Sequence, residues 1–533
     1  MSADSGTLSS ELYAPGVELL PGERADAGAA SVPSPGSAGI EGFARSRELF
    51  ESEVAWLASE EAGGLSHGEL EERLAVNARE LYRQLLEDHL ERRAEQEQRM
   101  EPVVGVDGVR RCSVERSHQR PLVTVFGEVG VRRFAYRARG HENLYPADGA
   151  LNLPVEKYSH GLRRVCAIES ARGSFQDACD ATWRATGQRV APRQLQQLAR
   201  RSAQDFESFY ASRKRDACEL GDALVLSCDG KGVVMRPDGL REATRKQAQS
   251  HTNKLKTRLS RGEKLGRKRI AEVAAVYEIK PAPRTVADIL PANDAERSAQ
   301  VPAPAAKHKW LSASVTDNAA TVVASMFQEA ERRDPKHQRR WIGLVDGNKH
   351  QIDRINAEAK ARKLKVTVLI DLIHVLEYLW KAVWCFFGEG DPAAELWVRG
   401  HAQQILAGNA TKVAGQIRRQ ATQAGLDPDK RVGADTCAAY LTNKHAYLDY
   451  PTALKNGWPI ATGVIEGACR HLVKDRLDLT GARWGLPGAE AILQLRAIRS
   501  NGDFEEYWRH HLAKEQERVH QSRYANGAIP QAS

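Results

Sequence analysis

Two aspartates stand directly after short apolar runs of the kind that form buried strands. The run 223–228 is followed by Asp229 and a glycine, and the run 341–345 is followed by Asp346 and a glycine. The end of a buried strand holds a side chain rigidly, and a following glycine lets a substrate backbone approach closely. Aspartate followed by glycine is also an ordinary turn. The pattern therefore allows either two functional acids or two turns.

A third acid lies near the C-terminus, in the segment Gly463–Arg476. If this segment is a helix, Glu466, Arg470 and Lys474 fall on one face at four-residue spacing. One interpretation is a solvated ion pair worth about 0.3–0.5 kcal/mol. The other is a metal-binding carboxylate with cations one and two turns away that hold phosphates.

Three carboxylates from two strands and a helix are the minimum for a magnesium site that acts on phosphodiesters. Mg²⁺ takes one or two carboxylates together with substrate phosphate and water. Two such ions about 3.5–4 Å apart, for which Mn²⁺ can substitute, activate a water or a 3′-hydroxyl and stabilise the leaving oxygen. The expected cofactor is therefore a pair of Mg²⁺ ions.

Positive charge is concentrated after the first aspartate. The whole chain carries 77 Lys and Arg against 69 Asp and Glu, whereas residues 231–270 alone hold 13 Lys or Arg against three acids. This stretch, which includes Arg267, Lys268 and Arg269, would supply the electrostatics of binding a polyanion.

A second basic element precedes the core. Residues 159–210 predict three short helices, with Ser159 and Ser174 as N-caps, Gly187 closing the second helix and Pro192 opening the third. The third helix carries Arg193 and Gln197, whose side-chain types pair with guanine and adenine edges. A helix-turn-helix DNA reader and a plain three-helix bundle with a polar outer face both fit this pattern.

The remaining elements follow from periodicity and turn residues. The runs 121–126 and 129–136 predict a β-hairpin turning at Gly127-Glu128. Strands are expected at 273–279, 309–315 and 366–370, with a helix after Asp346 that runs through Lys363. The region 375–460 is largely helical in pattern.

Composition narrows the class of protein. A chain of 533 residues predicts two to four domains. The eight cysteines form no C-x-x-C pair, which argues against a disulfide framework and a zinc finger. We expect no signal peptide, because the N-terminus has neither a basic start nor an apolar run. The most apolar window, 366–387, contains Asp371, His374, Glu377 and Lys381, which argues against a membrane span. We expect a cytoplasmic, nucleoid-associated protein with no membrane contact.

Four motifs in this order suggest a family. They are Leu226-Ser-Cys-Asp229-Gly, Leu344-Val-Asp346-Gly, Ile370-Asp371-Leu-Ile-His374 and Gly463-Val-Ile-Glu466-Gly. They resemble the DDE transposases of bacterial insertion sequences, in particular the ISKra-type group, which is related to Mutator-like elements. Three further segments look like the C-terminal signature of that family: Arg470-His-Leu-Val-Lys-Asp-Arg476, Thr480-Gly-Ala-Arg483-Trp484 and Leu495-Arg-Ala-Ile498.

The resemblance implies an α/β protein with an RNase H-like mixed-sheet core and an α-helical insertion before the last acid. Asp229, Asp346 and Glu466 would be the catalytic, metal-binding acids. Asp371 and His374 match an element that supports the core or the DNA ends in similar transposases. Asp371 also ends an apolar strand and is an alternative second acid. Asp346 is favoured because its strand–Asp-Gly setting repeats that of Asp229.

Further residues are expected to contact DNA. They are Arg193, Gln197, Arg267, Lys268, Arg269, Arg470, Lys474, Arg483 and Trp484. Trp484 is included because it could stack on an extruded base, but a buried core tryptophan is the favoured interpretation. Family members often have Ser-Gly before the last acid, whereas this chain has Thr462-Gly463, which keeps the hydroxyl.

The expected organisation has eight parts: a disordered tail (1–45), a helical support or oligomerisation region (46–101), a β-hairpin region (102–157), a helical region that includes the helix-turn-helix (158–215), the first part of the core (219–374), the helical insertion (375–460), the last part of the core (461–510) and a tail (511–533).

The function expected from this organisation is a transposase that binds double-stranded element ends, as a homo-oligomer on paired ends, and transfers them to target DNA. Three alternatives remain open: a related nuclease, a DNA-binding protein on a silent core, and a carboxylate-dependent RNA-processing enzyme.

Overall fold

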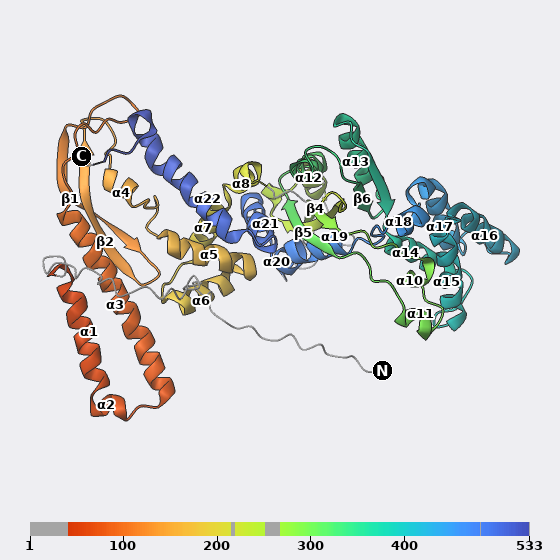
Figure 1. The fold of residues 1–533 in the computed structure, drawn as a ribbon, viewed down its shortest axis with the longest axis horizontal. Helices are drawn as coiled ribbons and strands as arrows, with labels where there is room; N and C mark the ends of the chain where they lie inside the picture. The colour runs from red at the N-terminus through yellow and green to blue at the C-terminus, as the bar shows by residue number, and fades with distance from the viewer. Residues whose placement is uncertain (1–40, 215–218, 251–266, 480, 532–533) are drawn as a thin grey trace, which may run out of the picture.

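Two antiparallel helices form an arm at one end of the molecule (Figure 1). The computed structural model describes residues 41–214, 219–250, 267–479 and 481–531. The arm consists of α1 (Ala44–Leu57), a short α2 (Glu60–Gly63) and α3 (His67–Glu95). Ser46 Oγ donates to Asp88 Oδ2 over 2.6 Å, and Arg73 lies 5.1 Å from the Trp56 ring centroid. These contacts hold the two long helices together. The prediction that residues 46–101 are helical is therefore confirmed for most of this region. Residues 1–40 of the expected tail lie outside the described part.

The predicted hairpin is present, but its turn is not where it was expected. β1 (Ser113–Val123) and β2 (Glu128–Arg137) pair antiparallel, with Val123 opposite Glu128, so the loop is 124–127. Thr124 Oγ1 donates to the Gly127 carbonyl over 2.8 Å and accepts from Phe126 N over 3.1 Å. A threonine that bonds its own loop favours this longer turn over the predicted Gly127-Glu128 turn.

The three helices predicted after the hairpin are confirmed, including their caps. They are α5 (His160–Arg172), α6 (Phe175–Thr186) and α7 (Pro192–Ala203), preceded by α4 (Pro146–Ala150) and followed by α8 (Phe206–Ser212). Ser159 and Ser174 accept hydrogen bonds from the first turns of α5 and α6. Gly187 ends α6 with a left-handed φ of 70°, and Pro192 occupies the first turn of α7.

A mixed five-stranded sheet occupies the middle of the molecule (Figure 1). Its strands are β3 (Ala223–Met235), β4 (Arg267–Ile279), β5 (Ala306–Ser314), β6 (Trp341–Val345) and β7 (Val366–Ile370). Their order across the sheet is β5-β4-β3-β6-β7. The β3–β4 and β4–β5 pairs are antiparallel, whereas β3–β6 and β6–β7 are parallel.

One sheet prediction is wrong in an informative way. Asp229 and Gly230 do not form a turn, because β3 continues through them to Met235. Asp229 pairs with Val273 and Gly230 pairs with Glu272 on β4. The long antiparallel partner keeps the chain extended past the point where the apolar run stops. Asp229 therefore lies inside a strand rather than at its end.

Helices pack beside the sheet, and a further group of helices forms the end of the molecule opposite the arm (Figure 1). α12 (Ala319–Arg333) and α13 (Lys349–Ala361) pack on the sheet, and α9 (Glu242–Gln249) follows β3. The short helices α10 (Val286–Ile289) and α11 (Asp294–Ser298) lie beside the insertion instead (Figure 1). The predicted insertion is helical: α14 (Leu372–Val383), α15 (Pro392–Leu406), α16 (Ala410–Gln423), α17 (Val432–Lys444) and α18 (Tyr450–Lys455). The chain then returns to the sheet through α19 (Gly463–Ala468), α20 (Asp475–Leu477) and α21 (Leu486–Ser500).

The C-terminal residues form ordered structure instead of the expected tail. Helix α22 (Phe504–Glu515) runs back toward the hairpin, and short helical turns follow it (Figure 1). Tyr524 is buried and pairs with Gly105, and Val106 N donates to the Arg523 carbonyl over 2.8 Å. This end of the chain therefore completes the hairpin region. No helix in the described ranges is both long and apolar enough to cross a membrane.

Candidate active site

The strand registers bring three aspartates to one level of the sheet. Leu226 pairs with Gly343 across β3 and β6, and Val345 pairs with Ile370 across β6 and β7. Continuing these registers puts Asp229 level with Asp346, and Asp346 level with Asp371. The carboxyl ends of parallel strands are a common place for functional groups in α/β proteins. Asp346 and Asp371 therefore follow the ends of β6 and β7, and Asp229 lies level with them within β3.

Asp346 is the more available of the last two aspartates. Its Oδ1 accepts a hydrogen bond from Asn348 N over 2.7 Å, whereas its Oδ2 has no hydrogen-bond partner among the described residues. Burial raises the pKa of the Asp346 carboxyl, and the negative charges of Asp229 and Asp371 act in the same direction. A nearby cation would relieve this cluster of negative charge.

The loop after Asp346 is closed by the helical insertion. Gly347 has a φ of 93°, and a Cβ at this position would collide with the Tyr440 hydroxyl on α17. Tyr440 donates to the Asp346 carbonyl over 3.3 Å and stacks on Tyr378 with ring centroids 3.9 Å apart. The glycine is thus needed for both its backbone conformation and its close approach to the insertion.

Asp371 has a structural task that uses both of its carboxyl oxygens. Its Oδ1 accepts from Ile373 N over 2.8 Å and caps α14, and its Oδ2 accepts the Thr462 hydroxyl proton. The side chain is 2% exposed. Thr462 directly precedes α19, so this bond ties the end of β7 to the helix that carries Glu466. Asp371 therefore positions the third acid, which leaves Asp346 as the freer carboxylate.

His374 is the neighbour of Glu466 in this region. His374 Nε2 lies 3.8 Å from Glu466 Oε1, and its Nδ1 lies 3.4 Å from Glu377 Oε2. The positive charge of a protonated His374 lowers the pKa of Asp346. The Glu466 side chain remains about half exposed. The sequence placed His374 in a supporting role, and it lies between the second and third acids.

The helix after Glu466 departs from the expected ladder. Residues Cys469–Lys474 form a π-helical segment, so Glu466, Arg470 and Lys474 are not one straight row at α-helical spacing. Arg470 Nε instead lies 3.7 Å from Asp475 Oδ1. The wider turn lets the Cys469 thiol donate to Asp229 Oδ2 over 3.2 Å. Single π-turns inside helices are frequent at functional sites.

The site fits a divalent cation only in part. Asp229 and Asp346 are neighbouring oxygen donors with like charge, as a Mg²⁺ site with one or two carboxylates requires. Glu466 points to His374, and the described residues hold no group of three or more His, Cys, Asp or Glu side chains able to bind a metal ion. The donor chemistry of the aspartate pair is therefore of the kind that Mg²⁺ uses, whereas Glu466 does not join the pair in a three-ligand group among the described residues.

Most side chains predicted to contact DNA are on the surface. Arg193 and Gln197 on α7 are exposed and have no partner among the described residues. Lys268 lies 3.8 Å from Asp478 and is exposed. The other predicted cations at the surface are Arg470, Lys474, Arg483 and, partly buried, Arg267. The segment 251–266 of the basic stretch lies outside the described residues.

Two of the side chains predicted to contact DNA are instead used within the fold. The Arg269 guanidinium donates to the backbone carbonyls of Val315, Gly239 and Thr316, so it holds the core together. Trp484 is 5% exposed, and its indole N–H donates to the Leu477 carbonyl over 3.0 Å. A tryptophan enclosed in this way cannot receive a base on its face, and the core alternative is confirmed.

The roles of four residues in this region were not predicted from the sequence. Cys469 and Tyr440 carry no sequence signal, because their contacts depend on a π-turn and on the docking of the insertion. Thr462 was noted for its hydroxyl but not for its bond to Asp371. Glu272 lies on β4 opposite Gly230, and the charge of Asp229 helps to raise its pKa after the effect of burial. The sequence did offer one signal for Glu272: it directly precedes the predicted strand 273–279, so a strand that begins one residue earlier would have included it.

In comparisons with known proteins, no family matches this chain, and no curated protein is similar to it.

Proposed function

We propose that this chain is a DDE transposase that cleaves the ends of a DNA element and joins the new 3′-hydroxyl groups to target DNA. The observation that carries this proposal is the level placement of Asp229 and Asp346 on neighbouring parallel strands. The helix bearing Glu466 is tied to the same edge through Thr462 and Asp371. A mixed five-stranded sheet in which one strand, β4, runs against the other four, followed by a helical insertion, is compatible with an RNase H-like core.

Asp229 and Asp346 would hold Mg²⁺, with Mn²⁺ as a substitute, and a second ion would be shared with Glu466. The bound ions supply activation of a water or 3′-hydroxyl and stabilisation of the leaving oxygen. Asp346 presents a free Oδ2 for this task. Asp371 caps α14 and accepts the Thr462 hydroxyl proton, and His374 contacts Glu466.

Double-stranded DNA is the partner that the surface supports. The exposed face of α7 presents Arg193 and Gln197, as a helix-turn-helix reader requires. Arg470 and Lys474 lie within eight residues of Glu466 on the chain and are both exposed. Such cations would position the phosphate backbone near the acids.

The arm supports assembly on paired DNA ends. Phe50, Val54 and Leu57 recur at helical spacing on α1 and are 56%, 49% and 41% exposed. This spacing puts them on one stripe of the helix. An unpaired apolar stripe on a two-helix arm is a typical interface for a second copy of the chain.

A DNA-binding protein without catalysis is the second candidate function. The observation that favours it is the orientation of Glu466, which contacts His374 and does not complete a three-ligand group within the described residues. In that case the aspartates would have only a structural role, as acceptors of the hydrogen bonds described above. A nuclease with the same site is distinguished by where it cuts.

A plasmid carrying the gene with its native flanks tests these functions. Purified protein is incubated with the plasmid and Mg²⁺ or Mn²⁺, and strand breaks are mapped. Asp229→Asn and Glu466→Gln are compared with Asp353→Asn, a matched change at an exposed aspartate on α13. We expect breaks at discrete positions flanking the gene for wild type and Asp353→Asn, and none for the two site variants. Binding without metal-dependent breaks would indicate the DNA-binding protein, and breaks everywhere would indicate a nuclease.

A further inference from the structure

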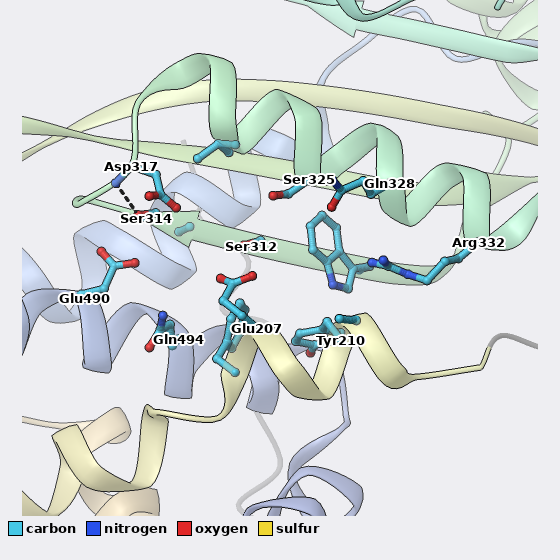
Figure 2. A pocket seen from close by; sticks show the side chains of 15 residues that line it. Glu207, Tyr210, Ser312, Ser314, Asp317, Ser325, Gln328, Arg332, Glu490 and Gln494 are labelled. Carbon is cyan, nitrogen blue, oxygen red and sulfur yellow. Dashed lines mark hydrogen bonds between the residues drawn. The ribbon is translucent and has the colours of Figure 1, made fainter. Parts of the chain in front are cut away.

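A small polar pocket lies apart from the aspartates, between α8, β5, α12 and α21. Figure 2 shows Glu207 on α8, Ser312 on β5, Gln328 on α12 and Gln494 on α21 around it. Its volume is about 50 Å³. A single water takes about 10–15 Å³ on this scale, so the space suits a ligand of about four non-hydrogen atoms.

Three carboxylates give the pocket negative charge. They belong to Glu207, Asp317 and Glu490, which Figure 2 shows around the same space. Burial raises the pKa of Glu207, and the charges of Asp317 and Glu490 raise it further. Arg332 is the single cation among the described lining residues, and it already donates to Glu329 Oε2 over 3.0 Å. The pocket therefore favours a positively charged guest.

A second observation points to a ligand that also accepts a hydrogen bond. Trp310 lines the pocket and is 3% exposed, and its indole N–H is buried without a hydrogen-bond partner. A buried donor left unpaired is destabilising unless an acceptor comes to it. Neighbouring Tyr210 does not provide one, because its hydroxyl donates to Asp503 and accepts from Asn501.

The remaining polar groups suit N–H donors. Ser312, Gln328 and Gln494 line the pocket, and their side-chain oxygens accept no hydrogen bond from the described residues. The aromatic rings of Phe206 and Trp310 add faces that attract a cation. A bare metal ion fits less well, since no group of three metal-binding side chains exists in the described part of the chain.

We propose that this pocket binds a small amino alcohol, whose primary ammonium is held by the carboxylates and whose hydroxyl oxygen accepts from the Trp310 indole. The ammonium donates to Glu207, with the carboxylates of Asp317 and Glu490 beside it, and the neighbouring hydroxyl lies toward the tryptophan. The site shares no residue with the aspartate pair, so a test of ligand binding here does not depend on the proposed catalysis.

Ethanolamine is the probe that matches this chemistry and size. The full chain is labelled with ¹⁵N at the tryptophan indoles, and Trp310→Phe identifies the resonance of that indole. Ethanolamine, ethylamine and ethylene glycol are titrated at constant ionic strength and pH. We expect ethanolamine to shift the Trp310 resonance saturably with a Kd on the order of 1 mM, because so small a ligand offers few contacts.

The two reference compounds separate the parts of the proposal. Ethylamine lacks the acceptor and is expected to bind at least fivefold more weakly, and ethylene glycol lacks the charge and is expected not to bind. Glu207→Gln should raise the Kd for ethanolamine at least tenfold, whereas Glu389→Gln at an exposed loop should not change it. Asp317→Asn gives the same test if Glu207→Gln fails to fold.

Three outcomes would overturn the proposal. They are the absence of a saturable shift at the Trp310 indole, equal shifts from all three compounds, and unchanged binding in Glu207→Gln or Asp317→Asn. Any of them would mean that the pocket is not a site for an amino alcohol.

Discussion

The thiol of Cys469 donates a hydrogen bond to Asp229 Oδ2 over 3.2 Å, although the two residues are 240 positions apart. The contact exists because a π-helical turn follows Glu466 and carries Cys469 onto β3. Burial and the negative charge of Asp229 both raise the pKa of this thiol, so it stays protonated as a donor. The bond therefore fixes the first acid relative to the helix of the third.

We predict that the hydrogen bond of Cys469 matters more than the volume of its sulfur. Cys469→Ala should lower the free energy of unfolding by about 1–3 kcal/mol, since a carboxylate loses its donor. Cys469→Ser keeps a donor and should be more stable than Cys469→Ala in urea denaturation.

Cys437 provides the matched comparison. It is fully buried and makes no hydrogen bond with described residues, so there Cys437→Ser should be less stable than Cys437→Ala. The same order of serine and alanine at both positions would contradict a bonding role for Cys469.

The bond between Thr462 and Asp371 gives a second prediction. Thr462→Val keeps the shape but leaves the buried Asp371 carboxylate with one donor fewer, which should destabilise the protein by about 1.5–3 kcal/mol. Thr462→Ser should be within about 1 kcal/mol of wild type. Urea denaturation checks both values.

A threonine on α17 serves as the control. Thr442 Oγ1 donates to the Ala438 carbonyl in its own helix, a bond that solvent or the helix can replace. Thr442→Val should therefore cost less than Thr462→Val. Equal losses would remove the argument that Thr462 ties the sheet to α19.

A buried charge network predicts how stability depends on pH. Burial raises the pKa of Glu515, but the charge of Arg163 and the hydrogen bond from Arg518 outweigh it and bring the pKa to about 2. For Asp205, burial acts upward and hydrogen bonds from His511 and Arg518 bring the pKa to about 2. Carboxylates with lowered pKa stabilise the fold above their unfolded pKa and stop doing so as pH falls through the folded value. Stability should therefore drop between about pH 5 and pH 2.

Glu515→Gln tests this network directly. At pH 7 the variant should be less stable than wild type by about 3 kcal/mol, because folding lowers the pKa of Glu515 from its ordinary value to about 2. Between pH 5 and pH 2 the difference should narrow, as wild type loses the same charge. Glu517→Gln, at an exposed glutamate paired with Lys514, should follow the wild-type pH profile. A Glu515→Gln gap that stays constant across this range would contradict the assignment.

DNA recognition by α7 can be tested separately from cleavage. Arg193→Ala should weaken binding to element-end DNA by roughly 5- to 150-fold and reduce the preference over scrambled DNA. Fluorescence anisotropy at fixed salt measures both. Arg419→Ala, at an exposed cation on α16 in the insertion, should leave that preference unchanged. Equal effects of both variants would mean that α7 contributes only charge.

Much of the sheet could be predicted because its strands are short apolar runs between clear turn residues. β6 and β7 have the predicted bounds of 341–345 and 366–370, and the caps at Ser159 and Ser174 follow local rules. Helix caps and buried strands depend on neighbouring residues, which a sequence displays directly.

The rest depended on distant partners. β3 continues through Asp229 because β4 runs beside it, and Cys469 meets Asp229 only because the helix widens after Glu466. Arg269 was expected on DNA from its charge, yet three backbone carbonyls take its guanidinium. Hydrophobic periodicity shows which face of a helix or strand is buried, but it does not show which distant element packs against that face.

The central claim is that Asp229 and Asp346 together hold a divalent ion, and Mn²⁺ binding followed by electron paramagnetic resonance tests it most directly. Wild type, Asp229→Asn, Asp346→Asn and the exposed-site control Asp353→Asn are titrated under the same conditions. The account predicts that each site variant binds Mn²⁺ at least tenfold more weakly, while Asp353→Asn binds as wild type does. Equal Mn²⁺ affinity in all four proteins would contradict it.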